Sequence, residues 1–378
     1  MKKHILLVGE KYSSNLGDGV ICEVVENIFK SKKFEIINFD ISGRTEYSKE
    51  NNEFNLKKEN LMYMKYNLKK VLSFFGYSKN GKNFEKIFRK FKQNFSNIVA
   101  KNKIDSVVFA GGQMFIDTFI YQINYICNYC EKNNIDVIFN CCGSGFILNK
   151  AVLQNVLNSE AVKYISVRDS YEKLKLLTRK EINDCYDSAI LSSKIYKKAI
   201  KPKFEYGVGI MFSTLQPPRM QVQFWKKMIK ELVNSGVEFR IFTNGSYKDY
   251  SFAKYILNKM NLDYKLYLIN QPTNPEELIN LVLKFQKILS MRLHSMIIAY
   301  SYDIPAISIS WDKKVNTFFE KIGLKNNCYS LKSNQKEILQ AILSLDYNCI
   351  NKKIKNNINI KICNNFEIIA SLIGKKNK

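Results

Sequence analysis

Short apolar runs bounded by Gly, Asn or Asp recur along the chain, and stretches with helical periodicity separate them. This alternation indicates parallel βαβ units, in which a helix follows each strand and returns the chain to the same end of the sheet. Candidate strands in the first half of the chain cover residues 5–9, 34–39, 106–110, 137–141 and 164–167. A second series covers residues 206–212, 238–242, 265–269, 287–290 and 306–310.

Two consecutive series of similar length predict an α/β protein with two Rossmann-like domains that face each other across a cleft. A chain of 378 residues is long enough for two such domains. We place the N-terminal domain at residues 1–200 and the C-terminal domain at 201–350. Residues 351–378 are expected to form a tail or a helix that packs back on the N-terminal domain. Because ligands bind beyond the carboxyl ends of parallel strands, the chemically important residues should directly follow strands.

Residues 44–103 interrupt this rhythm and are rich in Lys, Asn and aromatic residues. Four phenylalanines in this region fall at helical spacing and form one stripe: Phe84, Phe88, Phe91 and Phe95. Lysines surround the stripe at positions 82, 86, 90 and 92. Two interpretations are open. The stripe packs on the sheet as an ordinary amphipathic helix, or it lies at a membrane surface and touches anionic lipid.

The charge of the chain is strongly positive, with 59 basic residues against 34 acidic ones and a formal net charge of +25. Only seven of the basic residues are arginine. Nucleic-acid binders usually gather Lys and Arg in a stripe with stacking aromatic residues, and they use Arg for bidentate contacts. Because lysine is spread from end to end here, we expect no nucleic-acid partner. A general attraction to anionic substrates or to an anionic membrane fits the charge better.

The N-terminal segment MKKHILLVGEKY has an apolar run too short for a signal-peptide core, and Glu10 and Lys11 interrupt it. No apolar stretch approaches the roughly 20 residues that span a bilayer. We therefore expect a cytoplasmic protein, and peripheral contact with the inner face of the membrane is an open alternative.

Nine cysteines, an odd number, indicate free thiols in a reducing compartment. Cys127 and Cys130 form the only CxxC pair of the chain. A zinc site would need two further ligands, and the chain has two histidines and no second pair. We therefore expect Cys127 and Cys130 to pack on a helix face, and we expect no metal.

Two glycine-containing turns follow predicted strands. After the first strand, Asn15, Gly17 and Asp18 precede a helix with apolar periodicity. Asp18 either caps that helix or contacts a ligand, and a sugar hydroxyl suits a carboxylate there better than a phosphate does. The second turn follows the strand at 106–110 and consists of Gly111, Gly112 and Gln113. Paired glycines allow positive φ or a close backbone approach to a ligand.

Candidate catalytic side chains follow two other strands. Arg168 comes directly after the strand at 164–167 and either pairs with a carboxylate or binds substrate. In KILSMRLHSMIIAYSYDIPAISISWDKKV, a strand leads to Arg292 and His294, and a helix and another strand lead to Lys314. Since His4 lies at the first strand, His294 is the histidine placed for acid/base work near neutral pH. On extended backbone Arg292 and His294 would both face the cleft; the alternative is a capping histidine beside an exposed arginine.

Together these segments resemble the polysaccharide pyruvyl transferase family. The matching segments are NxGD at 15–18, AGG at 110–112, SVRDS at 166–170, YDSA at 186–189, RLHSMIIAY at 292–300 and IPAISISWDKKV at 304–315. Their order and spacing match over most of the chain, outside residues 44–103. Two positions depart from the family pattern, because Gln113 stands in place of a third glycine and Ser188 in place of a proline.

The resemblance implies a fold similar to that of the GT-B glycosyltransferases, with phosphoenolpyruvate as the donor. The implied product is a ketal pyruvate on a sugar of a cell-surface polysaccharide, such as a capsule or O-antigen, or of its lipid-linked precursor. The C-terminal domain is then the donor side and the N-terminal domain the acceptor side. The implied donor-binding residues are Arg168, Arg292 and Lys314, and the implied catalytic acid/base is His294. Asp18 is expected to orient or deprotonate the acceptor, beside the loops that hold Asn15, Gly17, Gly111, Gly112 and Gln113.

The chemistry of the donor fits these residue types. Phosphoenolpyruvate carries a carboxylate and a phosphate, which guanidinium binds as a fork and ammonium binds as a point charge. We expect no cofactor beside this co-substrate. Two alternatives stay open: a glycosyltransferase of the same architecture that uses a nucleotide sugar, and a lysine-rich module that binds anions without catalysis.

Overall fold

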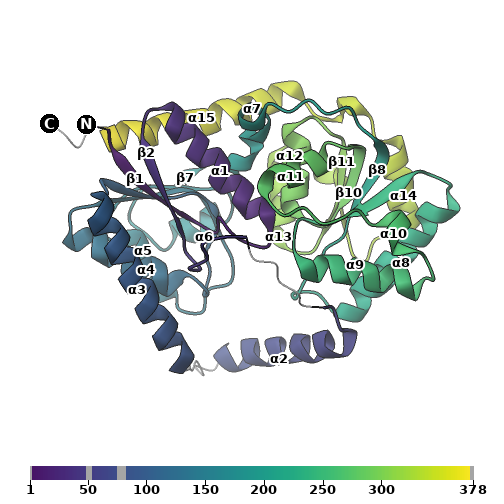
Figure 1. Ribbon diagram of the computed structural model, residues 1–378, viewed down its shortest axis with the longest axis horizontal. Coiled ribbons are helices and arrows are strands. Elements are labelled where there is room, and N and C mark those ends of the chain that lie inside the picture. The colour runs from purple at the N-terminus through teal and green to yellow at the C-terminus, as the bar shows by residue number, and fades with distance from the viewer. Residues whose placement is uncertain (1, 48–52, 75–81, 375–378) are drawn as a thin grey trace.

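The computed structural model describes residues 2–47, 53–74 and 82–374, which form two α/β domains side by side (Figure 1). The N-terminal sheet has the order β2-β1-β3-β5-β6-β7, with β4 paired to β5, and the pairs are parallel. Its strands are β1 (His4–Gly9), β2 (Glu35–Asp40), β3 (Ser106–Phe109), β4 (Gly112–Phe115), β5 (Asp136–Ser144), β6 (Val162–Val167) and β7 (Asn183–Asp184).

The C-terminal sheet has the order β12-β11-β10-β8-β9 and is also parallel. Its strands are β8 (Phe204–Gly209), β9 (Phe239–Phe242), β10 (Phe285–Ser290), β11 (Ala306–Ser310) and β12 (Cys328–Ser330). The prediction of two Rossmann-like domains is therefore confirmed. Sequence reasoning did not predict β4, β7 or β12, which are short.

Helices connect the strands and cover the sheets. In the N-terminal part they are α1 (Leu16–Ser31), α2 (Leu56–Phe74), α3 (Lys82–Asn102), α4 (Ile120–Lys132), α5 (Lys150–Asn158), α6 (Tyr171–Lys175), the 3-10 helix η1 (Ser188–Leu191) and α7 (Ser192–Tyr196). In the C-terminal part they are α8 (Pro218–Asn234), α9 (Tyr247–Lys259), α10 (Tyr264–Tyr267), α11 (Pro275–Val282), α12 (Leu293–Ser301), α13 (Lys313–Lys321), η2 (Lys325–Asn327), α14 (Gln335–Ser344), η3 (Tyr347–Cys349) and α15 (Lys352–Gly374).

The last helix, α15, returns along the upper edge of the molecule to the N-terminal domain (Figure 1). Its Phe366 ring lies 5.5 Å from the ring of Phe29 on α1. Its Asn365 donates to Asn140 Oδ1 at 2.8 Å and accepts from the Tyr164 hydroxyl at 2.9 Å. Apolar and polar contacts thus both hold α15 on the first sheet.

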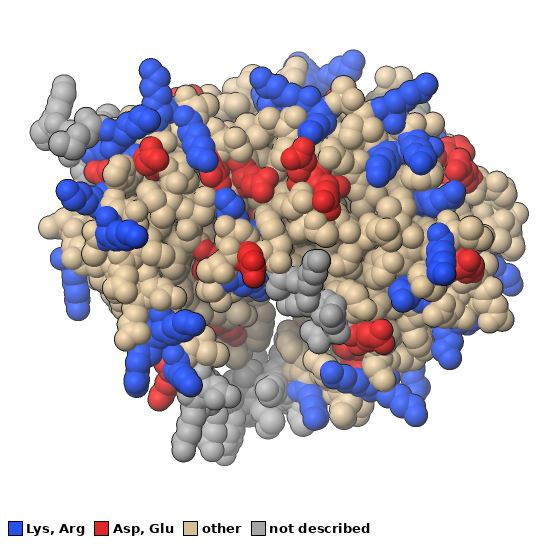
Figure 2. Space-filling view, viewed as in Figure 1, with Lys and Arg blue, Asp and Glu red and all other residues tan. Residues whose placement is uncertain are grey.

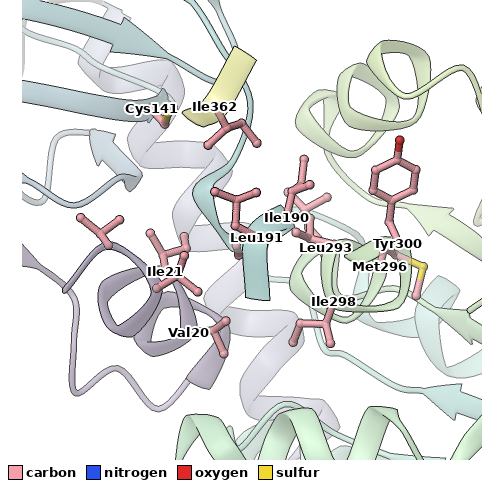
Figure 3. Close-up of a cluster of buried hydrophobic side chains, with 14 of the residues drawn as sticks. Val20, Ile21, Cys141, Ile190, Leu191, Leu293, Met296, Ile298, Tyr300 and Ile362 are labelled. Atoms are coloured by element: carbon pink, nitrogen blue, oxygen red, sulfur yellow. The ribbon is translucent and has the colours of Figure 1, made fainter. Parts of the chain in front are cut away.

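One buried hydrophobic cluster joins the two domains (Figure 3). It is built from α1 and η1 on the N-terminal side, α12 on the C-terminal side, and α15. Its members include Val20, Ile21, Ile190, Leu191, Leu293, Met296, Ile298, Tyr300 and Ile362. Because packed apolar surface resists separation, this cluster fixes the start of α1 against the start of α12.

The predicted strand at 265–269 is wrong. The chain there makes one helical turn, α10, and the side chain of Asp263 caps it by accepting from the backbone N–H of Lys265 at 3.0 Å. Only Leu268 joins the sheet, through a single bridge to Ile241. Over only five positions, an apolar run does not distinguish a strand from a helical turn. Here the cap by Asp263 stabilises the helical turn.

The phenylalanine stripe of α3 packs on the sheet, as the first of the two interpretations predicts. Phe91 and Phe95 are buried, and both rings lie within 5.6 Å of the ring of Phe39 on β2. The side chain of Phe84 lies outside the described residues. The interpretation of this stripe as a membrane-contacting face is wrong for Phe91 and Phe95, because the core buries both side chains.

Lysine and arginine are scattered over the visible face of the molecule and do not gather in a stripe (Figure 2). Cys127 and Cys130 are both buried on α4, where they pack in the core of the first domain. Among the described residues, no helix combines the length and the hydropathy that crossing a membrane would require.

Candidate active site

Arg168 lies at the carboxyl end of β6, and its side chain is buried between two carboxylates. Its NH1 nitrogen hydrogen-bonds Asp187, and its Nε nitrogen lies 3.4 Å from Asp169 Oδ2. Burial alone would raise the pKa of Asp187, but the charges of Arg168 and His294 hold that pKa well below its ordinary range. The guanidinium is therefore a fixed cation at the edge of the sheet.

His294 reaches this cation from the other domain. It stands in the first turn of α12, after β10 ends at Ser290, and only 6% of it is exposed. Its Nε2 lies 3.5 Å from NH1 of Arg168 and 3.8 Å from Oδ2 of Asp187, and its Nδ1 lies 3.9 Å from Oδ1 of Asp18. The imidazole is thus surrounded by charged groups of the N-terminal domain.

Gly17 is the reason that α1 approaches His294 so closely. A Cβ atom on Gly17 would lie 2.3 Å from Cβ, Cγ and Nδ1 of His294, closer than real side chains come. The turn therefore needs glycine for space rather than for backbone freedom. Sequence reasoning singled out Gly17, but the close neighbour it would meet is visible only in three dimensions.

Replacing Gly17 by alanine is expected to push the imidazole out of place. Misplacement of a reacting group by about 1 Å can cost about 100-fold in rate, so we expect a loss of kcat of that order. Overpacking should also lower the free energy of unfolding by about 1–3 kcal/mol. Turnover assays and chemical denaturation check both effects. Gly374→Ala is the matched control, because a Cβ there meets nothing within 4 Å. Equal kcat in both variants would contradict the role of this contact.

Lys314 approaches from the first turn of α13, the second element of the C-terminal domain that reaches the site. Its Nζ donates to Oε1 of Gln113 at 2.7 Å and lies 4.7 Å from the ring centre of Trp311. Burial, and then the charge of Arg168, lower the pKa of Lys314. The glutamine that departs from the family pattern thus holds a cation across the cleft.

The two glycine turns of the N-terminal domain meet beside these groups. Gly111 and Gly112 have φ angles of +118° and +79°, so the turn uses the backbone freedom of glycine. Asp18 Oδ2 accepts from the side-chain amide of Asn15 at 3.0 Å, and no side chain caps the start of α1. Asp18 is therefore a first-turn carboxylate that faces the site, not a helix cap.

The structure separates Arg292 from this cluster. Arg292 is the N-cap of α12 in extended conformation, whereas His294 already belongs to the helix, so the two side chains leave in different directions. The guanidinium of Arg292 binds Oδ2 of Asp249 through Nε at 2.7 Å and NH2 at 2.5 Å. Within the described part of the chain, no contact joins Arg292 to Arg168, His294 or Lys314. Arg292 and His294 thus bind different partners, and the expectation that both face the cleft stays a prediction.

A family model, described as polysaccharide pyruvyl transferase, matches residues 15–313. The chain belongs to this family. The match contains Arg168, His294 and the glycine turns, and it ends one residue before Lys314. No curated protein sequence matches the chain significantly. As a member of the polysaccharide pyruvyl transferases, the protein is a transferase.

Solved structures resemble the fold of this pyruvyl transferase family member over nearly its full length. A putative UDP-N-acetylglucosamine 2-epimerase from Listeria monocytogenes has a TM-score of 0.56 at 11% identity, covering 96% of this chain and 91% of its own. The UDP-GlcNAc 2-epimerase from Neisseria meningitidis has a TM-score of 0.55 at 12% identity, and a glycosyltransferase from Rickettsia africae has 0.51 at 14%, each covering 100% of both chains. At these identities the likeness establishes the two-domain GT-B-like fold.

Sequence reasoning did not single out three further charged residues near the candidate site. Asp187 holds Arg168, and its place in the YDSA segment was the available signal. Lys321 donates to the carbonyl oxygen of Arg168 at 3.1 Å and to Asp184 at 2.6 Å. Glu10 directly follows β1, and burial, followed by the charge of Asp18, raises the pKa of Glu10 to about 8.

A small cavity of about 20 Å³ lies beside Arg168 and Lys314. Its lining includes the cations Arg168, Lys314 and Lys321 and the carboxylates Asp169 and Asp187. This volume has room for about one water molecule. In the described part of the chain, no group of three or more His, Cys, Asp or Glu side chains is arranged to hold a metal ion.

Proposed function

We propose that the protein transfers the pyruvyl group of phosphoenolpyruvate to two hydroxyls of a saccharide, forming a ketal and releasing phosphate. The acceptor would be a sugar of a cell-surface polysaccharide, such as a capsule or O-antigen, or of its lipid-linked precursor. One observation supports this most. Arg168 from one domain and Lys314 from the other line the same buried space, and His294 lies 3.5 Å from Arg168.

The donor is a small, highly charged anion, and the cations of the site suit it. The guanidinium of Arg168 is held at NH1 by Asp187 and at Nε by Asp169, so its NH2 nitrogen is what it offers a donor. Lys314 can bind the same anion as a point charge. Arg292 is held by Asp249 at Nε and NH2, so its NH1 nitrogen is what it offers a donor. The proposed donor-binding residues that line the cavity are Arg168 and Lys314, and Arg292, which does not line it, stays the third proposed cation.

The proposed reaction balances with the groups present. One sugar hydroxyl attacks C2 of the enol phosphate while C3 takes up a proton, which converts the methylene to a methyl group. The second hydroxyl then attacks C2 and phosphate leaves with its bridging oxygen. Of the two hydroxyl protons, one replaces the proton delivered to C3 and the other leaves with phosphate. We assign the proton delivery to His294 and the orientation of the acceptor to Asp18. The scheme uses no cofactor.

We expect side chains of the site to move when the donor binds. A three-carbon phosphate is far larger than the single water molecule for which a space of about 20 Å³ has room. The hydrogen bond between Lys314 and Gln113 joins the two domains, and an anion bound by Lys314 would compete with it. Closure of a two-domain site around its ligand is a common way to exclude water from the reaction.

Mass spectrometry of saccharides incubated with the protein and phosphoenolpyruvate tests the proposal. We expect a product heavier than the acceptor by pyruvate less water, with one phosphate released per product. Isothermal titration should show binding of phosphoenolpyruvate and no tight binding of a nucleotide sugar. Tight binding of a nucleotide sugar alone, with glycosyl transfer in the assay, would reject the proposal in favour of a glycosyltransferase.

A further inference from the structure

Helix α2 lies along the lower edge of the molecule, on the side opposite α15, and bridges the two domains (Figure 1). The segment before it is anchored in the C-terminal domain, where the Phe54 ring lies 4.7 Å from that of Phe252. The backbone N–H of Phe54 donates to the Ser251 hydroxyl at 2.9 Å. On α2 itself, the buried Glu59 accepts from Lys248 at 2.8 Å. The start of α2 is therefore docked on the C-terminal domain.

The outer face of α2 carries an unusual combination of side chains. Four large apolar residues within six positions are exposed to solvent: Leu61 (53%), Met62 (44%), Met64 (68%) and Tyr66 (37%). Three exposed lysines share this face: Lys57, Lys58 and Lys65. At helical spacing they form two neighbouring rows, Lys57–Leu61–Met64 and Lys58–Met62–Tyr66, and Lys65 lies between the rows. We call these seven residues the α2 face.

Scattered exposed apolar residues are normal, but a group of four on less than two helical turns is not. The only acidic residue of the helix is Glu59, and it is buried against Lys248. The α2 face therefore combines exposed apolar side chains with lysines, and it carries no acidic side chain. These are the properties of helices that lie in the interface of an anionic bilayer, where apolar side chains enter the acyl boundary and lysines meet lipid phosphates.

The neighbouring end of α3 extends the same surface chemistry. Ile87 is 66% exposed between the exposed residues Lys86 and Lys90. Figure 1 places this end of α3 at the lower edge, beside the end of α2. Membrane contact is thus assigned to different residues from the buried phenylalanine stripe.

We propose that the α2 face is a docking surface for an anionic phospholipid membrane. The proposal extends the proposed function, because a lipid-linked acceptor would be met at a membrane. Vesicle binding needs neither donor nor acceptor, however. A failure of vesicle binding would reject the membrane surface alone, and a failure of turnover would reject the proposed function alone. The chain's net charge of +25 adds long-range attraction to the same kind of surface.

Flotation of the full-length protein with vesicles tests this surface. We expect binding to vesicles that contain phosphatidylglycerol, weakening with salt, and little binding to phosphatidylcholine alone. The variant Leu61→Gln/Met62→Gln/Met64→Gln should lower the partition coefficient by about tenfold or more, because glutamine keeps the helix but removes the inserting groups. Lys57→Gln/Lys58→Gln/Lys65→Gln should remove most of the dependence on anionic lipid.

The matched control replaces three exposed apolar residues elsewhere, Leu176→Gln/Leu266→Gln/Ile360→Gln, which are 85%, 66% and 57% exposed. Their binding should equal that of the unchanged protein, and circular dichroism verifies the fold of every variant. Equal loss in the control, or no loss in the α2 variants, overturns the proposal. A third outcome also overturns it. If the protein self-associates and the α2 variants are monomers with unchanged vesicle binding, the face is a contact between copies of the chain.

Discussion

Replacing His294 by alanine is expected to lower kcat by about 100- to 10,000-fold, the usual contribution of a positioned general acid/base. The dissociation constant for phosphoenolpyruvate should change little, because the cations that bind the donor are on other residues. The reason is geometric. The imidazole lies 3.5 Å from Arg168 and 3.9 Å from Asp18, so it stands between the proposed donor and acceptor groups.

Two controls make this result specific. His4→Ala removes the other histidine of the chain, whose Nδ1 lies 2.6 Å from the carbonyl oxygen of Asn102, at the far end of β1. Its kcat should stay close to that of the unchanged protein. His294→Asn retains polar contacts and reduces any collapse of the site, and it should be as inactive as the alanine variant. Substantial turnover without the imidazole would show that another group delivers the proton.

The fold was predictable because its signal is repeated. Most central strands of the two sheets contain a buried apolar run, and a helix follows most of them, so local errors do not change the topology. Where the apolar run was short, local interactions such as helix capping determined the structure instead. The cap at Asp263 made a helical turn of α10, and strands of two to four residues such as β7 and β12 carry too little periodicity to detect.

The site was predictable only in part, for reasons that differ between residues. Arg168, His294 and Lys314 follow strands, and parallel strands bring their carboxyl ends together. The direction of Arg292 depends on where α12 begins, and helix boundaries are uncertain by a residue or two. The partner of Arg168 was hidden because Asp187 follows the two-residue strand β7, 19 positions further along the chain.

The exposed face of α2 could not be read from the sequence. The segment around it contains apolar and basic residues on both sides, and the more regular pattern belongs to Phe88, Phe91 and Phe95. That regular stripe packs on the sheet, because apolar side chains at helical spacing form the continuous face that a helix needs to cover a sheet. Which side of α2 is exposed follows from the anchors Phe54 and Glu59, which bind residues almost two hundred positions away.

Replacing Arg168 by alanine should lower both the free energy of unfolding and the affinity for the donor. Asp187 is buried and pairs with Arg168, so removing the guanidinium leaves a carboxylate without its main countercharge. Breaking one side of a buried ion pair typically lowers the free energy of unfolding by about 3–5 kcal/mol. Urea denaturation measures this loss, and titration with phosphoenolpyruvate should show no binding at the concentrations that saturate the unchanged protein.

A second variant separates the two effects. In Arg168→Met/Asp187→Asn both charges of the closest pair are absent, and asparagine can still accept from the N–H of Ala189, as Asp187 does at 2.9 Å. Asp169 loses its contact with Nε of Arg168 but keeps the hydrogen bond from the N–H of Ser144 at 2.9 Å. Most of the lost stability should therefore return, since replacing a whole buried ion pair is often nearly neutral. Donor binding and turnover should not return, because methionine offers no cation. A stable double variant that still transfers pyruvate would mean that Arg168 maintains the fold and that the donor is bound by other residues.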